Sequence, residues 1–191
     1  MKPPPLILAS ASPRRAQLLQ SAGLEFVAIP AQVPEIQPDH LTPHEAVQIN
    51  AYRKARVLAK QHPDAVVLGA DTEVSLDRRV FGKPSNLEAA REMLSALQGR
   101  THEVISGVCL VHLRAHRQRL FAVSTLVTFR PLNAAQIRDY LARTQPLDKA
   151  GAYAIQEEGH LIVEALDGSF TNVVGLPMAR VLEELGTTFC R

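Results

Sequence analysis

The stretch Leu6-Ile-Leu-Ala-Ser-Ala-Ser-Pro-Arg-Arg15 decides how this chain begins to fold, because an apolar run leads directly into a helix start. The apolar half predicts a buried strand. Ser12 is placed as the helix N-cap and Pro13 as the first helical residue, where its missing N–H costs nothing. Arg14 and Arg15 then lie in the first helical turn, where the helix dipole disfavours each cation by about 0.3–1 kcal/mol.

An anion bound at this turn would relieve that conflict. Free backbone N–H groups at a helix start and two guanidinium groups together favour a phosphate. The same residues are equally compatible with a simpler interpretation, in which Arg14 and Arg15 are ordinary solvated side chains near a strand-to-helix turn. The rest of the chain has to decide between the two.

Further helix starts are marked along the sequence. Thr42-Pro-His-Glu45 is a capping box with proline at the first helical position, and Ser85 with Glu88 and Asn133 with Gln136 resemble it. Glycines mark two of the helix ends, at Gly23 and Gly99. The predicted helices cover residues 13–22, 43–62, 85–97, 133–142 and 177–185.

Strand-like runs lie between these helices. They cover residues 6–10, 24–29, 65–70, 80–81, 103–113, 120–129, 161–165 and 170–174. Helices and strands alternate in the first half of the chain, and adjacent strands dominate the middle. This order predicts an α/β protein with a mixed central sheet flanked by helices, folded as one bilobed domain over residues 1–191.

Composition excludes several classes of protein. The chain has 191 residues, of which 46% are hydrophobic and 21% charged, as in a soluble globular protein. A net charge of +2 and 5% aromatic residues argue against a nucleic-acid-binding module. Cys109 and Cys190 lie far apart without a CxxC pair, which favours reduced thiols. With no membrane-length apolar run and no signal-peptide pattern, we expect a cytoplasmic protein without a membrane partner.

Asp71 is the most informative acidic residue. The run Val66-Val-Leu-Gly-Ala-Asp-Thr72 leads an apolar strand directly into this carboxylate. The carboxyl end of a buried strand is where α/β sheets place ligands, and a carboxylate there needs solvent, a cation or a metal ion. The alternative is that Asp71 and Thr72 only open a turn.

Two lysines are weaker candidates. Lys83 lies in the tight loop Phe81-Gly-Lys-Pro84, from which it can reach a phosphate as a point charge. Lysines are also common in exposed loops. Lys54 lies in the middle of a predicted helix beside Arg53 and Arg56, and this pattern alone favours an exposed side chain.

The segment Leu147-Asp-Lys-Ala-Gly-Ala-Tyr-Ala-Ile-Gln156 combines charges, small residues and an amide. Small residues allow close backbone approach to a ligand, and the Gln156 amide can read a base edge through one donor and one acceptor. His102 is expected to be a structural hydrogen-bonding residue. The inventory favours phosphate chemistry assisted by a hard cation, since no Ser/His/Asp arrangement indicates acyl transfer.

Five motifs in order resemble the Maf family of nucleoside triphosphate pyrophosphatases along the whole chain. They are Leu8-Ala-Ser-Ala-Ser-Pro-Arg-Arg15, Gly69-Ala-Asp-Thr72, Gly82-Lys-Pro84, Asp148-Lys-Ala-Gly-Ala-Tyr153 with Gln156, and Asn172-Val-Val-Gly-Leu-Pro177. The resemblance implies a Maf/ITPase-like fold with a substrate cleft and a homodimer. It also implies hydrolysis of a nucleoside triphosphate between its α and β phosphates, which yields a monophosphate and pyrophosphate.

The resemblance also assigns roles to individual residues. Asp71 would be the general base that activates water, and Glu35 with Asp71 would hold a divalent cation, Mg²⁺ or Mn²⁺. Glu35 lies in a proline-rich stretch, so its assignment rests on position alone. The residues that would bind the substrate are Ser12, Arg14, Arg15, Lys54, Thr72, Lys83 and Gln156, of which Thr72 and Gln156 would help to select the base.

Within the family, Asp148–Tyr153 and Thr128-Phe-Arg130 resemble the subgroup that acts on dTTP and UTP, with modified pyrimidine nucleotides as further substrates. One alternative is the subgroup that acts on 7-methyl-GTP or other modified nucleotides. A second is a non-catalytic, nucleotide-binding regulator of septum formation. Two departures stand out: Glu157-Glu158 follows Gln156 where many members have glycine, and Ser106 replaces the usual threonine. The acidic pair Glu157-Glu158 bears on the base preference.

Overall fold

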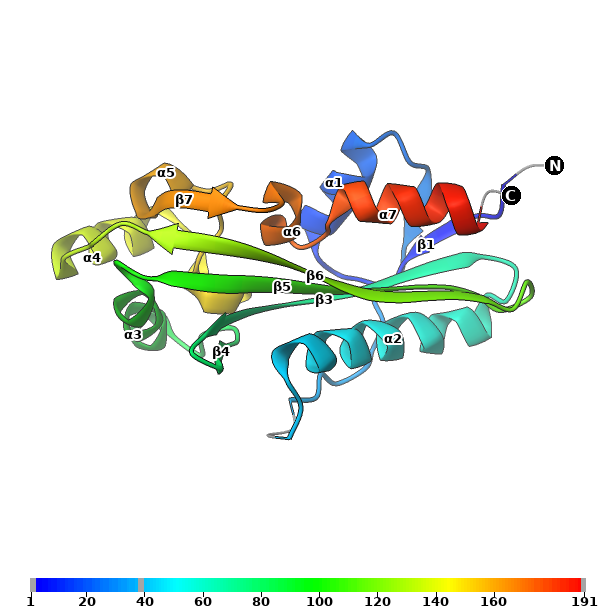
Figure 1. The fold of residues 1–191 in the computed structure, drawn as a ribbon, viewed down its shortest axis with the longest axis horizontal. Coiled ribbons are helices and arrows are strands. Elements are labelled where there is room, and N and C mark those ends of the chain that lie inside the picture. The colour runs from blue at the N-terminus through cyan, green and yellow to red at the C-terminus, as the bar shows by residue number, and fades with distance from the viewer. Residues whose placement is uncertain (1–2, 38–39, 190–191) are drawn as a thin grey trace. The chain divides into compact units, whose positions relative to one another are not determined.

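A mixed β-sheet forms the centre of the fold. The computed structural model describes residues 3–37 and 40–189, and Cys190 lies outside the described residues. The strand order is β2-β1-β3-β5-β6-β7, with β4 paired to β3 (Figure 1). The strands are β1 (Leu6–Leu8), β2 (Phe26–Ala28), β3 (Val66–Leu76), β4 (Arg79–Phe81), β5 (Thr101–His112), β6 (Arg117–Phe129) and β7 (Val163–Asp167). Pairing of β1 with β2 and β3 is parallel, whereas β4 and β7 pair antiparallel, so the predicted mixed sheet is confirmed.

Helices connect and cover these strands. They are α1 (Pro13–Ser21), α2 (Pro43–Gln61), α3 (Leu87–Leu97), α4 (Ala134–Arg143), α5 (Gly159–Ile162), α6 (Phe170–Val174) and α7 (Met178–Glu184). Two 3₁₀ turns, η1 (Pro146–Asp148) and η2 (Ala150–Ala152), follow α4, and a π-helical turn, η3 (Leu185–Phe189), follows α7. In the part of the chain that the structure describes, none of the helices is long and apolar enough to cross a membrane.

Most of the helix starts follow the capping signals. The capping boxes at Thr42 and Asn133 are both present, with side-chain and backbone bonds in each direction. The third start differs by one residue, because Asn86 rather than Ser85 caps α3 and accepts a hydrogen bond from Ala89 N at 2.9 Å. Ser12 is the N-cap of α1 as predicted, but its side chain makes no capping hydrogen bond with the described residues.

The strand predicted over residues 170–174 is wrong, because these residues form helix α6. The chain leaves β7 through Gly168, which has a φ of 126°, a backbone conformation that glycine adopts readily and other residues rarely do. Ser169 Oγ then accepts a hydrogen bond from Asn172 N at 3.2 Å, in the way an N-cap does. This local capping overrides the β propensity of the apolar residues. The run predicted over 161–165 is also shifted, since α5 precedes β7.

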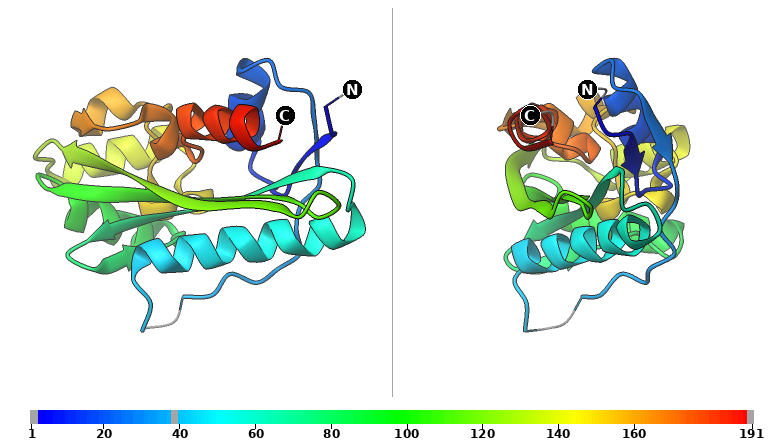
Figure 2. Two further views of the ribbon diagram at one scale, coloured as in Figure 1. Left: turned by 45° about the vertical axis from the view of Figure 1, so that its right-hand side comes forward. Right: turned by 90° about the vertical axis from the view of Figure 1, so that its right-hand side faces the viewer.

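The chain divides into two compact units. Unit 1 comprises residues 1–71, 106–123 and 175–191, and unit 2 comprises residues 72–105 and 124–174. The single bilobed domain expected from the sequence stays a prediction. In unit 1, α2 covers one face of the strands, and α1 and α7 cover the other (Figures 1 and 2). A separate cluster of buried apolar side chains packs between each face and the helices that cover it.

Two glycines let α2 lie unusually close to the sheet. A Cβ on Gly69 of β3 would come within 2.3 Å of Ala51 O, and one on Gly107 of β5 within 2.4 Å of Val47 O. Both positions therefore exclude any larger residue unless the helix moves away. This close approach brings the inward face of α2 to the strand that carries Asp71.

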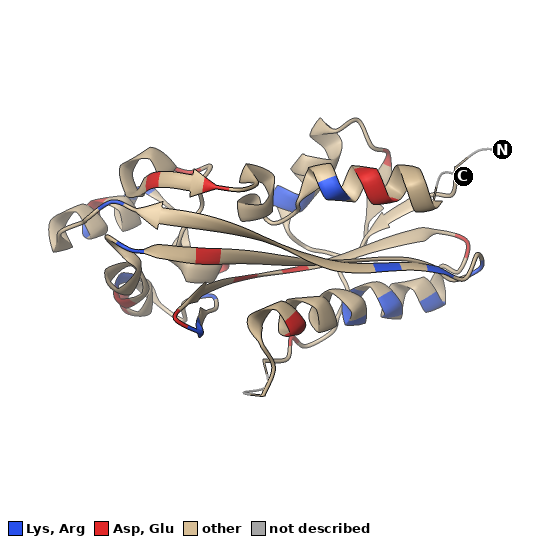
Figure 3. Cartoon of the chain, in the orientation of Figure 1, with Lys and Arg blue, Asp and Glu red and all other residues tan. Residues whose placement is uncertain are grey.

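Basic residues recur along α2 and near the turn between β5 and β6 (Figure 3). Several of them are paired with carboxylates. Arg114 Nε lies 2.7 Å from Asp64 Oδ1, and Arg119 Nε lies 3.1 Å from Glu184 Oε2. The positive charge in this region is therefore partly balanced.

Unit 2 encloses an aromatic cluster around His102. The imidazole is only 2% exposed and packs edge-on against Phe129 and Tyr153. Its Nε2 lies 2.9 Å from the Tyr153 hydroxyl, which confirms the expected structural hydrogen bond. Burial lowers the pKa of His102 to about 4, because the apolar surroundings disfavour the charged ring.

This depressed pKa predicts acid destabilisation. Between the ordinary pKa of 6.5 and the folded-state value of about 4, the unfolded chain binds a proton that the folded chain does not. The free energy of unfolding should therefore fall as the pH drops through this window, by up to about 3 kcal/mol from this residue. The free energy of unfolding, measured by urea titrations between pH 7 and 4, should depend less on pH in His102→Gln than in wild type. The exposed-residue control His160→Gln should keep the wild-type slope; equal slopes in all three proteins would contradict the prediction.

Candidate active site

Asp71 is buried on β3, at 5% exposure, just beyond the part of the strand that pairs with β1. The sequence predicted that the strand ends at Ala70, which is wrong. β3 continues to Leu76, and its last residues pair with β4. The polar run after Ala70 hides this continuation, because residues such as Asp71 and Glu73 are buried within a strand instead of opening a turn.

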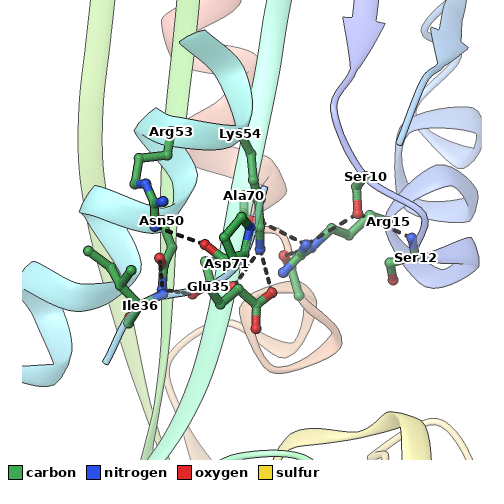
Figure 4. A network of polar contacts seen from close by, with 12 residues as sticks. Ser10, Ser12, Arg15, Glu35, Ile36, Asn50, Arg53, Lys54, Ala70 and Asp71 are labelled. Carbon is green, nitrogen blue, oxygen red and sulfur yellow. Dashed lines mark hydrogen bonds and ion pairs between the residues drawn. The ribbon is translucent and has the colours of Figure 1, made fainter. Parts of the chain in front are cut away.

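Two side chains of α2 hold the Asp71 carboxylate. Lys54 Nζ donates to Asp71 Oδ1 at 2.8 Å, and Asn50 Nδ2 donates to Asp71 Oδ2 at 3.0 Å (Figure 4). Asn50 and Lys54 lie four residues apart, so they project from the same face of the helix. Each carboxylate oxygen therefore has a donor and keeps a lone-pair position for a further one.

Lys54 is buried, at 9% exposure, which contradicts the exposed side chain that its helical neighbours suggested. Its ammonium group also donates to Glu35 Oε1 at 2.7 Å, and it lies 3.4 Å from Ala70 O. Two carboxylates therefore converge on one cation, and the three charges sum to −1. Such a buried cation is tolerated only because it is paired.

The segment that carries Glu35 is fastened to α2 on both sides of that residue. Asn50 accepts a hydrogen bond from Ile36 N at 2.9 Å and donates to Ile36 O at 3.0 Å. Arg53 Nη1 donates to Pro34 O at 2.8 Å. Glu35 itself stays accessible, with 54% of its side chain exposed.

Sequence reasoning missed Asn50, although its i, i+4 spacing to Lys54 was a usable signal.

Arg15 is buried and connects three segments of unit 1. Its Nη1 donates to Ala70 O at 2.9 Å and to Ser10 Oγ at 3.3 Å, and its Nε donates to Gly175 O at 3.0 Å. Burial lowers the pKa of Arg15, and the charges of Asp71 and Glu35 oppose that shift. The guanidinium group thus ties the loop before α1 to the residue that precedes Asp71. Sequence reasoning did not single out Ser10.

Arg14 has a different environment from its neighbour, since it is half-buried beside the half-buried N-cap Ser12. The two arginines should therefore respond differently to truncation. We expect Arg14→Ala to reduce nucleotide turnover strongly while its thermal unfolding midpoint stays within a few degrees of wild type. Arg15→Ala should lower the midpoint clearly, because it removes three buried hydrogen bonds, to Ser10 Oγ, Ala70 O and Gly175 O. Equal midpoints for the two variants would contradict this assignment.

The remaining predicted substrate residues belong to unit 2. Thr72 is half-buried on β3, Lys83 is exposed in the loop between β4 and α3, and Gln156 is exposed in the turn before α5. Gly151 N donates to Gly82 O at 3.1 Å, which ties the loop of Lys83 to the motif that starts at Asp148. Gly151 has a φ of 68°, and a Cβ there would meet Val74 at 3.1 Å.

The donor set at Asp71 suits a hard divalent cation. No group of three or more His, Cys, Asp or Glu side chains in residues 3–37 and 40–189 is arranged to hold a metal ion by itself. The carboxylates of Glu35 and Asp71, however, lie near one another, because both contact Lys54 Nζ. Mg²⁺ is commonly bound by one or two carboxylates together with substrate phosphates and water, so two carboxylates fit this mode.

Comparison with known proteins shows which family this chain belongs to. The chain is 47% identical over 180 residues to a protein of Moorella thermoacetica, covering 94% of this chain and 93% of that protein. It is 44% identical over 180 residues to one of Syntrophus aciditrophicus, covering 94% and 88%. Both relatives are named dTTP/UTP pyrophosphatase.

A solved structure supports the fold. The HAM1 protein from Coxiella burnetii matches with a TM-score of 0.50 and 18% identity, covering 95% of this chain and 96% of that one. The Maf-like protein family matches residues 5–188, which include every predicted site residue. This chain therefore belongs to the Maf-like protein family.

Proposed function

We propose that this chain hydrolyses dTTP and UTP to the nucleoside monophosphate and pyrophosphate, with Asp71 as the general base. The observation that carries the proposal is the buried Asp71 carboxylate, held by Lys54 and Asn50 and joined through Lys54 to Glu35. Relatives of 42–47% identity that are named dTTP/UTP pyrophosphatase support the substrate class.

This geometry supports the following chemistry. A water molecule hydrogen-bonded to a remaining lone pair of Asp71 loses its proton to the carboxylate as its oxygen forms a bond to the α-phosphorus. The bond from that phosphorus to the bridging oxygen breaks, and pyrophosphate leaves with the bonding electron pair. Lys54 and Asn50 keep the carboxylate in one orientation, so little reorganisation is needed when the proton moves.

The phosphates need cationic partners of their own. We assign Arg14, Ser12 and the backbone N–H groups at the start of α1 to the triphosphate, because a helix start with a nearby guanidinium group suits an anion. Arg15 belongs to the same loop and supports its shape through Ser10 and Ala70. The substrate contacts of Lys54, Lys83, Thr72 and Gln156 stay predictions from the family resemblance.

We also propose a divalent cation, Mg²⁺ or Mn²⁺, held by Glu35 and Asp71. When bound, the ion would neutralise charge on the phosphate oxygens. Glu35 is suited to this role because its side chain is accessible while its backbone is fastened to α2. The homodimer, the cytoplasmic location and the absence of a nucleic-acid partner also stay predictions.

A panel of nucleotides tests the function. Pyrophosphate release should be fastest with dTTP and UTP, and it should require added Mg²⁺ or Mn²⁺. Turnover of 7-methyl-GTP well above that of dTTP and UTP would favour the alternative subgroup. Tight nucleotide binding without hydrolysis of any panel member would favour a non-catalytic regulator.

A further inference from the structure

The turn that carries Gln156 rests on a buried polar framework within unit 2. Gln156 is exposed, between Ala154 and Glu157. Tyr140 of α4 is 1% exposed, and its hydroxyl accepts from Ala154 N at 3.3 Å and lies 3.5 Å from Glu157 O, to which it donates. Glu157 N donates to Ala154 O at 3.2 Å and closes the turn. One buried hydroxyl therefore spans the base of the turn.

A buried lysine holds the same turn from a second side. The Lys149 side chain is only 4% exposed. Its ammonium group contacts Gln145 O, Asp148 Oδ1 at 2.8 Å and Glu157 Oε2 at 3.2 Å. An ammonium group has three protons, so these three acceptors use its full capacity. The partly exposed Glu157 carboxylate next to Gln156 is thus held by a buried cation that it shares with Asp148.

The backbone around the turn adopts conformations that need such support. Ala152 has a φ of 63° and Glu158 a φ of 52°, so non-glycine residues in the left-handed region lie on both sides of Gln156. This conformation is unfavourable for a residue with a Cβ and persists where the surroundings hold it. Tyr140 and Lys149 contact the chain between these two positions and provide that support.

We propose that Tyr140, Lys149 and Glu157 are positioning residues for base selection, which act by holding the backbone of the turn so that the Gln156 side chain projects from one fixed place. This inference rests on the proposed function of Gln156. Uracil and thymine present an N–H donor between two carbonyl acceptors, whereas cytosine presents an acceptor beside an amino donor. An amide that projects from a fixed backbone meets the base from one position and distinguishes these patterns, whereas an amide on a mobile turn can adjust to both. The framework therefore sets the preference for uracil and thymine nucleotides over cytosine nucleotides.

The test compares kcat and KM for UTP and CTP, from pyrophosphate release, in wild type and in Gln156→Ala, Glu157→Gln, Lys149→Met and Tyr140→Phe. Glu158→Gln is the matched control, since it removes the adjacent carboxylate, which lies 3.9 Å from His160, and leaves the Lys149 cluster intact. Thermal unfolding of each variant identifies those that fail to fold. Glu157→Gln is the mildest change and keeps the shape of the side chain.

We expect Gln156→Ala and Glu157→Gln each to reduce the UTP-to-CTP ratio of kcat/KM by roughly tenfold, mainly through KM. Glu158→Gln should keep the wild-type ratio. If Gln156→Ala reduces the ratio while Glu157→Gln and Tyr140→Phe leave it unchanged, the framework role is overturned and the role of Gln156 stands. Slower turnover of both nucleotides by one common factor, with the ratio unchanged, also overturns it. If wild type does not hydrolyse UTP, the proposed function itself is wrong.

Discussion

Asp71→Asn is expected to lower kcat for dTTP by about 10²–10⁴-fold, the range that a positioned general base contributes. The substitution keeps the size of the side chain but removes the group that accepts the proton from water. It also places an amide among donors from Lys54 and Asn50, which surround the carboxylate at 2.8 and 3.0 Å. Initial rates of pyrophosphate release at saturating dTTP measure the effect.

The matched control is Asp64→Asn, the same chemical change at an exposed surface pair with Arg114. Its kcat should equal that of wild type, because exposed ion pairs contribute about 0–1 kcal/mol to stability and this one touches no predicted site residue. If Asp71→Asn retained more than a tenth of the wild-type kcat while dTTP binding was unchanged, another group would have to be the base.

Lys54→Met is expected to destabilise the fold by about 3–5 kcal/mol at neutral pH, because it leaves the buried Asp71 carboxylate without its cation. The side-chain exposures of Lys54 and Asp71, 11% and 7%, place this pair among buried ion pairs. Methionine preserves the length and packing of the lysine stem, so the lost charge dominates the effect. Urea denaturation with a chelator present measures the free energy of unfolding without a bound cation.

Two variants make this result interpretable. Lys60→Met changes an exposed lysine of the same helix and should alter the free energy of unfolding by less than about 0.5 kcal/mol. The double variant Lys54→Met/Asp71→Asn removes both charges and should recover part of the lost stability. A double variant as unstable as the sum of the two single changes would show that the Lys54–Asp71 pair contributes no coupling.

Local chemistry allowed much of the fold to be predicted. Capping boxes at Thr42 and Asn133 mark where α2 and α4 begin, because these signals act over four neighbouring residues. Apolar periodicity located six of the seven strands approximately. It misplaced the start of β7 and mistook α6 for a strand, since the capping of α6 by Ser169 outweighs the propensity of its apolar side chains.

The residues of the candidate site were likewise only partly predictable from the sequence. The sequence singled out Asp71 and the loop of Ser12, Arg14 and Arg15, because their signals lie within a few neighbouring residues: a carboxylate after an apolar run, and cations at a helix start. It also singled out Lys54, but only through the resemblance, since the helix pattern around Lys54 predicted an exposed side chain. Asn50 was not predicted at all.

Long-range packing decided these last two roles. Gly69 and Gly107 allow α2 to approach the sheet so closely that the helix face with Asn50 and Lys54 meets Asp71, 17 residues from Lys54 along the chain. The same packing gives the adjacent Arg14 and Arg15 different environments. Arg15 is buried and links Ser10, Ala70 and Gly175, whereas Arg14 is half-buried beside the helix start. Neighbouring residues establish which chemical groups are present, whereas their burial and partners depend on segments far away in the sequence, which only the folded chain brings together.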